Sequence, residues 1–155
     1  MIEIEQPAPE FRLYNTEKNM VTLAELQGRN VVLLFFPLAF TSVCTKELCS
    51  VRDNISAYNN LNATVFGISV DSVYTLKIFK EQQHLNFELL SDFNKDVSGL
   101  YEAMYDTFSL GMKGVSKRAA FVIDKNGILR YKEVLENAGD VPDFEAIKTT
   151  LADIA

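Results

Sequence analysis

At 155 residues, of which 48% are hydrophobic and 23% charged, the chain has the composition of a folded globular protein, and we expect one domain over residues 1–155. A formal net charge of −6, without a basic cluster, argues against nucleic acid and membrane surfaces as partners. An acidic start and apolar runs too short to span a bilayer predict a cytoplasmic protein.

The order of apolar and polar segments predicts an α/β protein with the thioredoxin-like arrangement, a central mixed β-sheet flanked by helices. At the start of the chain we expect an extended segment at 7–11, a hairpin-like stretch around 14–21 and a short turn at 23–26. Strands and helices then alternate: a strand at 31–36, a helix at 42–59, a strand at 63–70, a helix at 72–84, a strand at 87–90 and a helix at 94–101. The chain continues with strands at 119–123 and 128–134 joined by Asn126-Gly127, and with a helix opened by Pro142 that runs to about 153.

The strand at 31–36 and the turn after it form the most informative stretch. The strand is an unbroken apolar run, which is typical of a strand buried on both faces, and Pro37 ends it. Thr41 and Ser42 are good N-cap residues, so Cys44 falls in the first turn of the next helix. In open α/β sheets, ligands bind at this carboxyl end of the strands.

Cys44 is predicted to be a reactive thiol. A helix start carries unpaired N–H groups, here those of Val43 and Cys44, and a partial positive charge. Both stabilise an anion and lower the pKa of a thiol at that position. The alternative is a buried cysteine that packs as a small hydrophobic residue, but the strand, proline, cap and helix start together favour the reactive thiol.

The pattern Pro37-x-x-x-Thr41-x-x-Cys44-Thr45-x-Glu47 resembles the active-site signature of the peroxiredoxins, the thiol peroxidases. Segment 36–41 is most similar to the alkyl hydroperoxidase E subgroup, whereas a second cysteine five residues after the first is typical of the bacterioferritin-comigratory (Q-type) subgroup. The resemblance covers nearly the whole chain, and its later landmarks are Gly67-Ile68-Ser69-Val70-Asp71, Leu89-Leu90-Ser91-Asp92 and Arg118-Ala119-Ala120-Phe121-Val122-Ile123-Asp124. The resemblance implies a thioredoxin-like fold with the peroxiredoxin N-terminal extension, and reduction of hydrogen peroxide and organic hydroperoxides in antioxidant defence. It implies no metal and no bound organic cofactor.

The resemblance also assigns residue roles. It implies that Cys44 attacks the peroxide, that Arg118 contacts the cysteine sulfur and the peroxide, that Pro37 shields the thiolate from water, and that Glu47 supports the site. Without the resemblance, we would expect Arg118 to be a surface arginine at a strand edge. The Thr41 hydroxyl lies close enough to serve either the helix cap or the substrate.

Two alternatives remain for the second cysteine, Cys49. Attack on peroxide would turn Cys44 into a sulfenic acid, which a thiol resolves. Residues five apart in an ideal helix have Cα atoms about 8.7 Å apart, and a disulfide needs less than about 7 Å. Cys49 therefore resolves Cys44 only if the first helical turns unwind; otherwise Cys49 is a core residue and an external thiol, such as a thioredoxin-like protein, resolves.

The cysteine and histidine content argues against other classes of site and function. Two cysteines and one histidine cannot supply the four ligands of a closed zinc site, and His84 is expected on the surface at the polar end of a helix. A thioredoxin-like disulfide exchanger or a holdase-type interaction module is the competing class. The cysteine pair is not in a Cys-x-x-Cys arrangement, which argues against the exchanger.

The loop 103–117 holds apolar residues and two glycines, which suggests a covered or interface surface. The resemblance places this region near the active site and the common dimer interface. We therefore expect a monomer or a homodimer formed through the active-site-side loops.

Overall fold

The structure is a computed structural model that describes residues 2–155, apart from the side chain of Cys44. The strands are β1 (Arg12–Asn15), β2 (Met20–Thr22), β3 (Asn30–Phe35), β4 (Ala63–Ser69), β5 (Glu88–Ser91), β6 (Arg118–Ile123) and β7 (Leu129–Leu135). The helices are α1 (Ser42–Asp53), α2 (Ile55–Asn60), α3 (Val73–Gln82), α4 (Asp96–Leu100) and α5 (Phe144–Ile154), with short 3-10 turns η1 (Ala24–Leu26) and η2 (Ser109–Gly111). Over the described residues, no helix is both long and apolar enough to cross a membrane.

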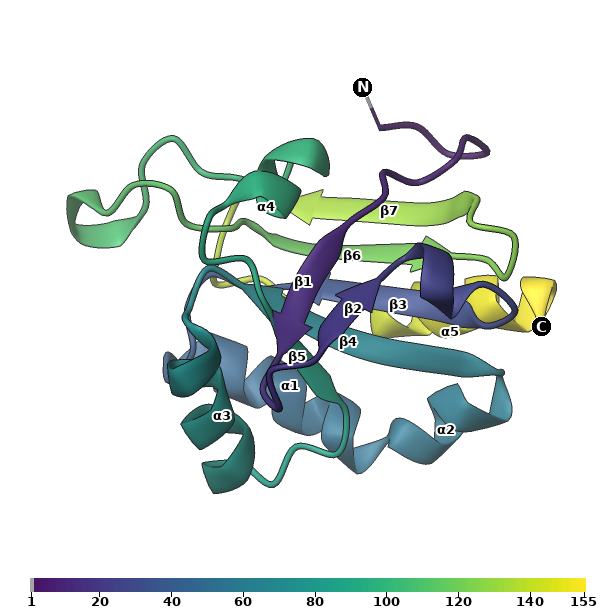
Figure 1. The fold of residues 1–155 in the computed structure, drawn as a ribbon, viewed down its shortest axis with the longest axis horizontal. Coiled ribbons are helices and arrows are strands. Elements are labelled where there is room, and N and C mark those ends of the chain that lie inside the picture. The colour runs from purple at the N-terminus through teal and green to yellow at the C-terminus, as the bar shows by residue number, and fades with distance from the viewer. Residues whose placement is uncertain (1) are drawn as a thin grey trace.

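The strands form one seven-stranded mixed sheet in the order β2-β1-β5-β4-β3-β6-β7 (Figure 1). β3, β4 and β5 are parallel neighbours, and the remaining pairs are antiparallel. β3 lies between β4 and β6 and is buried along its whole length, as its unbroken apolar run predicts. The carboxyl end of β3 therefore meets the carboxyl end of β4 and the start of β6 at one edge of the sheet.

Two apolar layers cover the two faces of the sheet. Helices α1, α2, α3 and α5 pack on one face through a shared set of buried side chains: Leu48, Val51, Tyr58, Leu76, Phe79, Ile147 and Leu151. The N-terminal segment, the chain between β2 and η1, and α4 with the residues just after it cover the other face with a second set: Ile2, Phe11, Leu23, Val97, Tyr101 and Ala103. Figure 1 also shows the chain between α4 and β6, which carries η2, projecting from the body of the molecule.

Most predicted elements are confirmed to within a few residues, and two predictions are wrong. The single helix expected at 42–59 is two helices that break at Asn54, whose backbone leaves the helical region (φ −120°, ψ 18°) and whose side chain donates to the Ser50 carbonyl at 2.9 Å. That bond satisfies a carbonyl near the end of α1 and favours termination there. Pro142 does not open α5; Asp143 is the N-cap, and its carboxylate accepts the Ala146 N–H at 3.0 Å.

Candidate active site

The loop that follows β3 is tied to the neighbouring strand. Beyond the end of β3 the Phe36 N–H still pairs with β4 at 2.9 Å, and Pro37 follows as a buried residue. Asp71, just after β4, accepts hydrogen bonds from the Ala39 N–H at 2.8 Å and the Ser69 hydroxyl at 2.7 Å. The loop is thereby held at the carboxyl edge of the sheet. This role of Asp71 was not predicted from the sequence, although a carboxylate just beyond a buried strand is a signal for such a role.

Phe40 shapes the turn from this loop into α1. Its backbone is left-handed (φ +70°), a conformation that costs free energy for a residue with a bulky side chain. Its ring packs edge-on against Phe79, with centroids 5.1 Å apart, yet 49% of the residue remains exposed. The packing offsets part of the strain and fixes the point at which the helix begins.

Helix α1 begins after Thr41, which occupies the N-cap position with extended backbone (φ −83°, ψ 151°). The Thr41 hydroxyl does not cap the helix but donates to the Leu38 carbonyl at 3.0 Å, so the interpretation as a side-chain cap is wrong. The first internal helical bond runs from the Thr45 N–H to the Thr41 carbonyl at 3.0 Å. The N–H groups of Val43 and Cys44 precede that bond and point out of the helix end. Because its only proton is donated to Leu38, the Thr41 hydroxyl can act toward a further partner only as an acceptor, through its lone pairs.

The backbone of Cys44 lies in the first turn of α1, where the sequence predicts it. Its side chain lies outside the described part of the structure. The predicted contacts of the Cys44 sulfur with Pro37, Thr41 and Arg118 therefore stay predictions.

Arg118, the first residue of β6, is a buried arginine at the carboxyl end of β3, because its neighbour Ala119 pairs with Phe35. Its Nη1 donates to Glu47 Oε1 at 2.7 Å, and the two side chains are 1% and 0% exposed. Nε and Nη2 both donate to the Ala138 carbonyl, at 3.2 and 3.0 Å. The alternative of a surface arginine is wrong, and the guanidinium is oriented from two sides.

Glu47 lies on α1 one helical turn after Cys44, on the same face of the helix. The Arg118–Glu47 pair is therefore next to the turn that carries the predicted nucleophile. Its second oxygen, Oε2, has no hydrogen-bond partner in the part of the chain that is described. Burial raises the pKa of Glu47 from 4.5 to about 7, although the charge and hydrogen bond of Arg118 act to lower it. The carboxyl thus titrates near neutral pH.

The raised pKa of Glu47 predicts a pH-dependent stability. The folded protein binds this proton more tightly than the unfolded chain, so the stabilising effect of protonation is present below pH 4.5 and is lost as pH rises to about 7. Glu47→Gln imitates the neutral carboxyl, and Arg118 stays charged throughout. We expect the stability of the wild type relative to Glu47→Gln to fall across this range in urea unfolding, with Glu145→Gln, on an exposed residue, as the matched surface control. A difference that stays constant with pH would contradict the prediction.

Cys49 lies five residues after Cys44 in α1, which runs without a break from Ser42 to Asp53. It is half-buried, packs against the core, and its Sγ lies 3.6 Å from Gln83 Oε1. An unbroken helix keeps the two Cα atoms about 8.7 Å apart. Both alternatives for Cys49 therefore remain, and an internal disulfide requires the helix to open.

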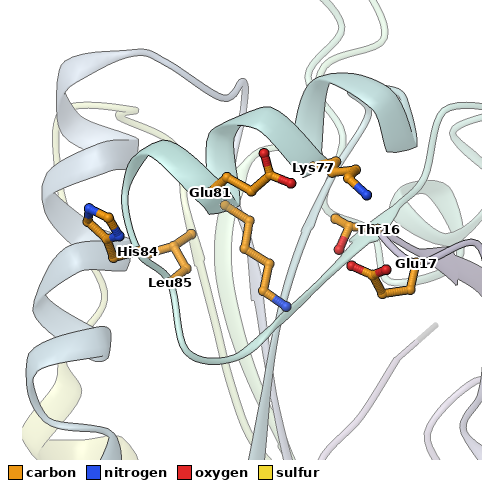
Figure 2. Close-up of a pocket in the computed structure, with 7 residues that line it drawn as sticks. Thr16, Glu17, Lys77, Glu81, His84 and Leu85 are labelled. Atoms are coloured by element: carbon orange, nitrogen blue, oxygen red, sulfur yellow. The ribbon is translucent and has the colours of Figure 1, made fainter.

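A hollow of about 290 Å³ lies between the C-terminal half of α3 and the turn that joins β1 to β2 (Figure 2). Its lining mixes basic and acidic side chains and includes His84, which is exposed as predicted. None of its lining residues belongs to the segment 37–47 or to the Arg118 pair. Within the described residues no three His, Cys, Asp or Glu side chains gather as a metal site.

The backbone of Cys44 at the start of α1, after a buried central strand and a buried proline, and the buried Arg118–Glu47 pair at the same edge of the sheet are features expected of a thiol enzyme with an α/β fold. A profile of the AhpC/TSA family matches residues 4–132 of this chain. The chain therefore belongs to that family, the peroxiredoxins: it is a thiol peroxidase with a thioredoxin-like fold and antioxidant activity.

Particular relatives agree with this assignment. The chain is 37% identical over 144 residues to alkyl hydroperoxide reductase E from Mycobacterium tuberculosis, covering 92% of each chain. It is 40% identical over 130 residues to a putative peroxiredoxin bcp from Coxiella burnetii, covering 83% of this chain and 85% of the relative. The crystal structure of peroxidoxin BcpB from Mycobacterium tuberculosis superposes with a TM-score of 0.87 at 28% identity, over 100% of this chain and 99% of that one.

Proposed function

We propose that the chain reduces hydrogen peroxide and organic hydroperoxides through Cys44. The thiolate attacks one peroxide oxygen and becomes a sulfenic acid, while the O–O bond breaks and the other oxygen leaves as hydroxide or alkoxide and takes up a proton. The observation that carries this proposal is the buried Arg118–Glu47 pair, one helical turn after Cys44 at the carboxyl edge of the sheet.

A reactive thiolate alone does not account for fast peroxide reduction. Lowering a thiol pKa from ~8.5 to ~6 raises the thiolate fraction at neutral pH about tenfold to thirtyfold. The same change costs roughly tenfold in intrinsic nucleophilicity at a Brønsted slope of ~0.4–0.5. The two effects nearly cancel, so the site must also stabilise the charge that moves onto the leaving oxygen.

The groups around Cys44 suit that task. Arg118 supplies a fixed positive charge with planar donors. The N–H groups at the start of α1, including that of Val43, supply further donors. In this proposal the Thr41 oxygen, whose proton is donated to the Leu38 carbonyl, accepts the hydrogen of a hydroperoxide, and buried Pro37 limits the approach of water. Glu47 holds Arg118 in position, which makes it a supporting residue.

The family and the relative named alkyl hydroperoxide reductase support the proposed substrate class. Purified protein with a dithiol reductant should consume both hydrogen peroxide and an alkyl hydroperoxide, and should be much slower in a disulfide-reduction assay. Peroxide consumption at the level of a heat-denatured control, with active disulfide reduction, would favour the disulfide exchanger instead.

We further propose that a thiol closes the cycle, either Cys49 within the chain or a thioredoxin-like protein. The mass of the intact protein after one equivalent of peroxide separates the two routes. Loss of two hydrogens reports a Cys44–Cys49 disulfide, and gain of one oxygen reports a persistent sulfenic acid. We expect the disulfide in the wild type and the oxygen adduct in Cys49→Ser; an oxygen adduct in the wild type would assign resolution to an external thiol.

An internal disulfide also requires a change in α1. The two cysteines cannot bond in the intact helix, so oxidation should melt segment 42–49 and expose half-buried Val43 and buried Leu48. Hydrogen exchange should show deprotection of this segment in oxidised protein, with α5 unchanged as the internal control. Protection of 42–49 that is equal in reduced and fully disulfide-bonded protein would contradict the unwinding.

The partner expected at the active-site side is a second copy or a thiol reductant. Large apolar side chains are exposed there on the loop before α1 and on the projecting segment: Phe40 at 49%, Leu110 at 97% and Met112 at 37%. Such a group favours burial against another molecule. Analytical ultracentrifugation decides between the monomer and the homodimer that we propose through these loops.

A further inference from the structure

The turn between β7 and α5 contacts the arginine of the site. Residues 136–141 are exposed apart from Ala138, which is half-buried. The Ala138 carbonyl accepts two hydrogen bonds from Arg118, from Nε at 3.2 Å and from Nη2 at 3.0 Å. This backbone oxygen therefore binds the Nε–Nη2 edge of the guanidinium, whereas Glu47 binds Nη1.

Asn137 gives this turn its shape. Its Oδ1 accepts the Gly139 N–H at 2.8 Å, and its carbonyl accepts the Asp140 N–H at 3.1 Å. Such a side-chain-to-backbone bond two residues along the chain is the pattern of an Asx-turn. The hydrogen bond from the Gly139 N–H to Asn137 Oδ1 spans Ala138 and so fixes the direction of the Ala138 carbonyl.

The turn is also anchored at its first residue. The Tyr105 hydroxyl donates to the Glu136 carbonyl at 3.0 Å, and Lys117 Nζ donates to Glu136 Oε1 at 2.7 Å. Both anchors come from the segment before β6, and neither involves the Asn137 side chain. A change at Asn137 should therefore alter the local turn while the loop stays attached.

We infer that Asn137 is a positioning residue for peroxide reduction: through its bond to Gly139 it aims the Ala138 carbonyl at Arg118 and so fixes the plane of the guanidinium. This inference rests on the proposed role of Arg118. With Glu47 on Nη1 and Ala138 on Nε and Nη2, the remaining donors of the fork point in defined directions. Loss of the Ala138 bonds would remove the contact that orients the Nε–Nη2 edge of the guanidinium.

The test compares Asn137→Ala with Asn137→Asp, which keeps an oxygen acceptor, and with Asn126→Ala in the exposed turn at the opposite end of the β6–β7 hairpin. We expect Asn137→Ala to lower the second-order rate constant with peroxide about tenfold, as a small misplacement of a catalytic group does. Alkylation of Cys44 by iodoacetamide, which needs thiolate but no polarised O–O bond, should change less than about twofold, because the charge of Arg118 remains. Asn137→Asp and Asn126→Ala should react with peroxide as the wild type does.

A double-mutant cycle with Arg118→Lys separates the outcomes. If Asn137 acts through Arg118, Asn137→Ala has little further effect in the Arg118→Lys background. Equal loss in Asn137→Ala and Asn137→Asp, a parallel fall in alkylation, or additive effects in the cycle would each overturn the inference. If Arg118→Lys itself leaves the peroxide rate unchanged, the proposed role of Arg118 fails first; a slow Arg118→Lys with a normal Asn137→Ala overturns only the role of the turn.

Discussion

Replacing Cys44 by serine is expected to abolish peroxide consumption. A serine hydroxyl carries almost no anion at neutral pH and cannot form the sulfenic acid that divides the reaction into two steps. Stopped-flow mixing with excess peroxide measures the first turnover directly. A Cys44→Ser protein that still consumes peroxide would overturn the assignment of the catalytic cysteine.

Cys49→Ser is the matched control, because it makes the same atomic change in the same helix. Cys49 is half-buried in α1 and bonds Gln83, at a position without the helix-start environment. The first turnover of Cys49→Ser should stay close to that of the wild type, and only later turnovers should depend on the added reductant. A first turnover that is lost in Cys49→Ser as well would mean that the two cysteines act as one unit.

Local patterns in the sequence predicted much of the fold. The apolar run ended by Pro37 predicted β3, because a strand buried on both faces needs apolar residues at every position. The Asn126-Gly127 turn predicted the β6–β7 hairpin, in which Gly127 adopts φ +84°. The break at Asn54 was missed because it depends on a hydrogen bond to Ser50 within an otherwise regular helical pattern.

The candidate site was only partly predictable. Position along the chain indicated Cys44, Thr41 and Glu47, because the start of one helix brings them together. The bonds of Arg118 were not predictable, since its partner Ala138 contributes a backbone carbonyl, which any residue carries. The raised pKa of Glu47 likewise depends on burial by elements distant in the sequence.

Arg118→Lys is expected to slow peroxide reduction by about tenfold or more, on the order of 1.4 kcal/mol per decade. Lysine keeps the charge but loses the planar fork, so one ammonium group cannot reproduce bonds to both Glu47 and the Ala138 carbonyl. Buried acceptors are then left unsatisfied, at a cost of about 1–3 kcal/mol in the free energy of unfolding. The reactivity of Cys44 toward iodoacetamide should fall much less than the peroxide rate, because a positive charge remains beside the helix start.

Arg130→Lys provides the matched control. Arg130 also lies on the β6–β7 hairpin and also forms ion pairs, with Asp124 at 2.7 Å and Glu5 at 2.9 Å, but its side chain is 34% exposed. The same substitution there should leave the peroxide rate unchanged, because Arg130 pairs with Asp124 and Glu5 and not with a residue of the candidate site. Equal rates for Arg118→Lys and the wild type would show that Arg118 acts only as a buried charge. A large loss in Arg118→Lys alone would assign the geometry of its guanidinium to the transition state, since charge and chain length change little between the two side chains.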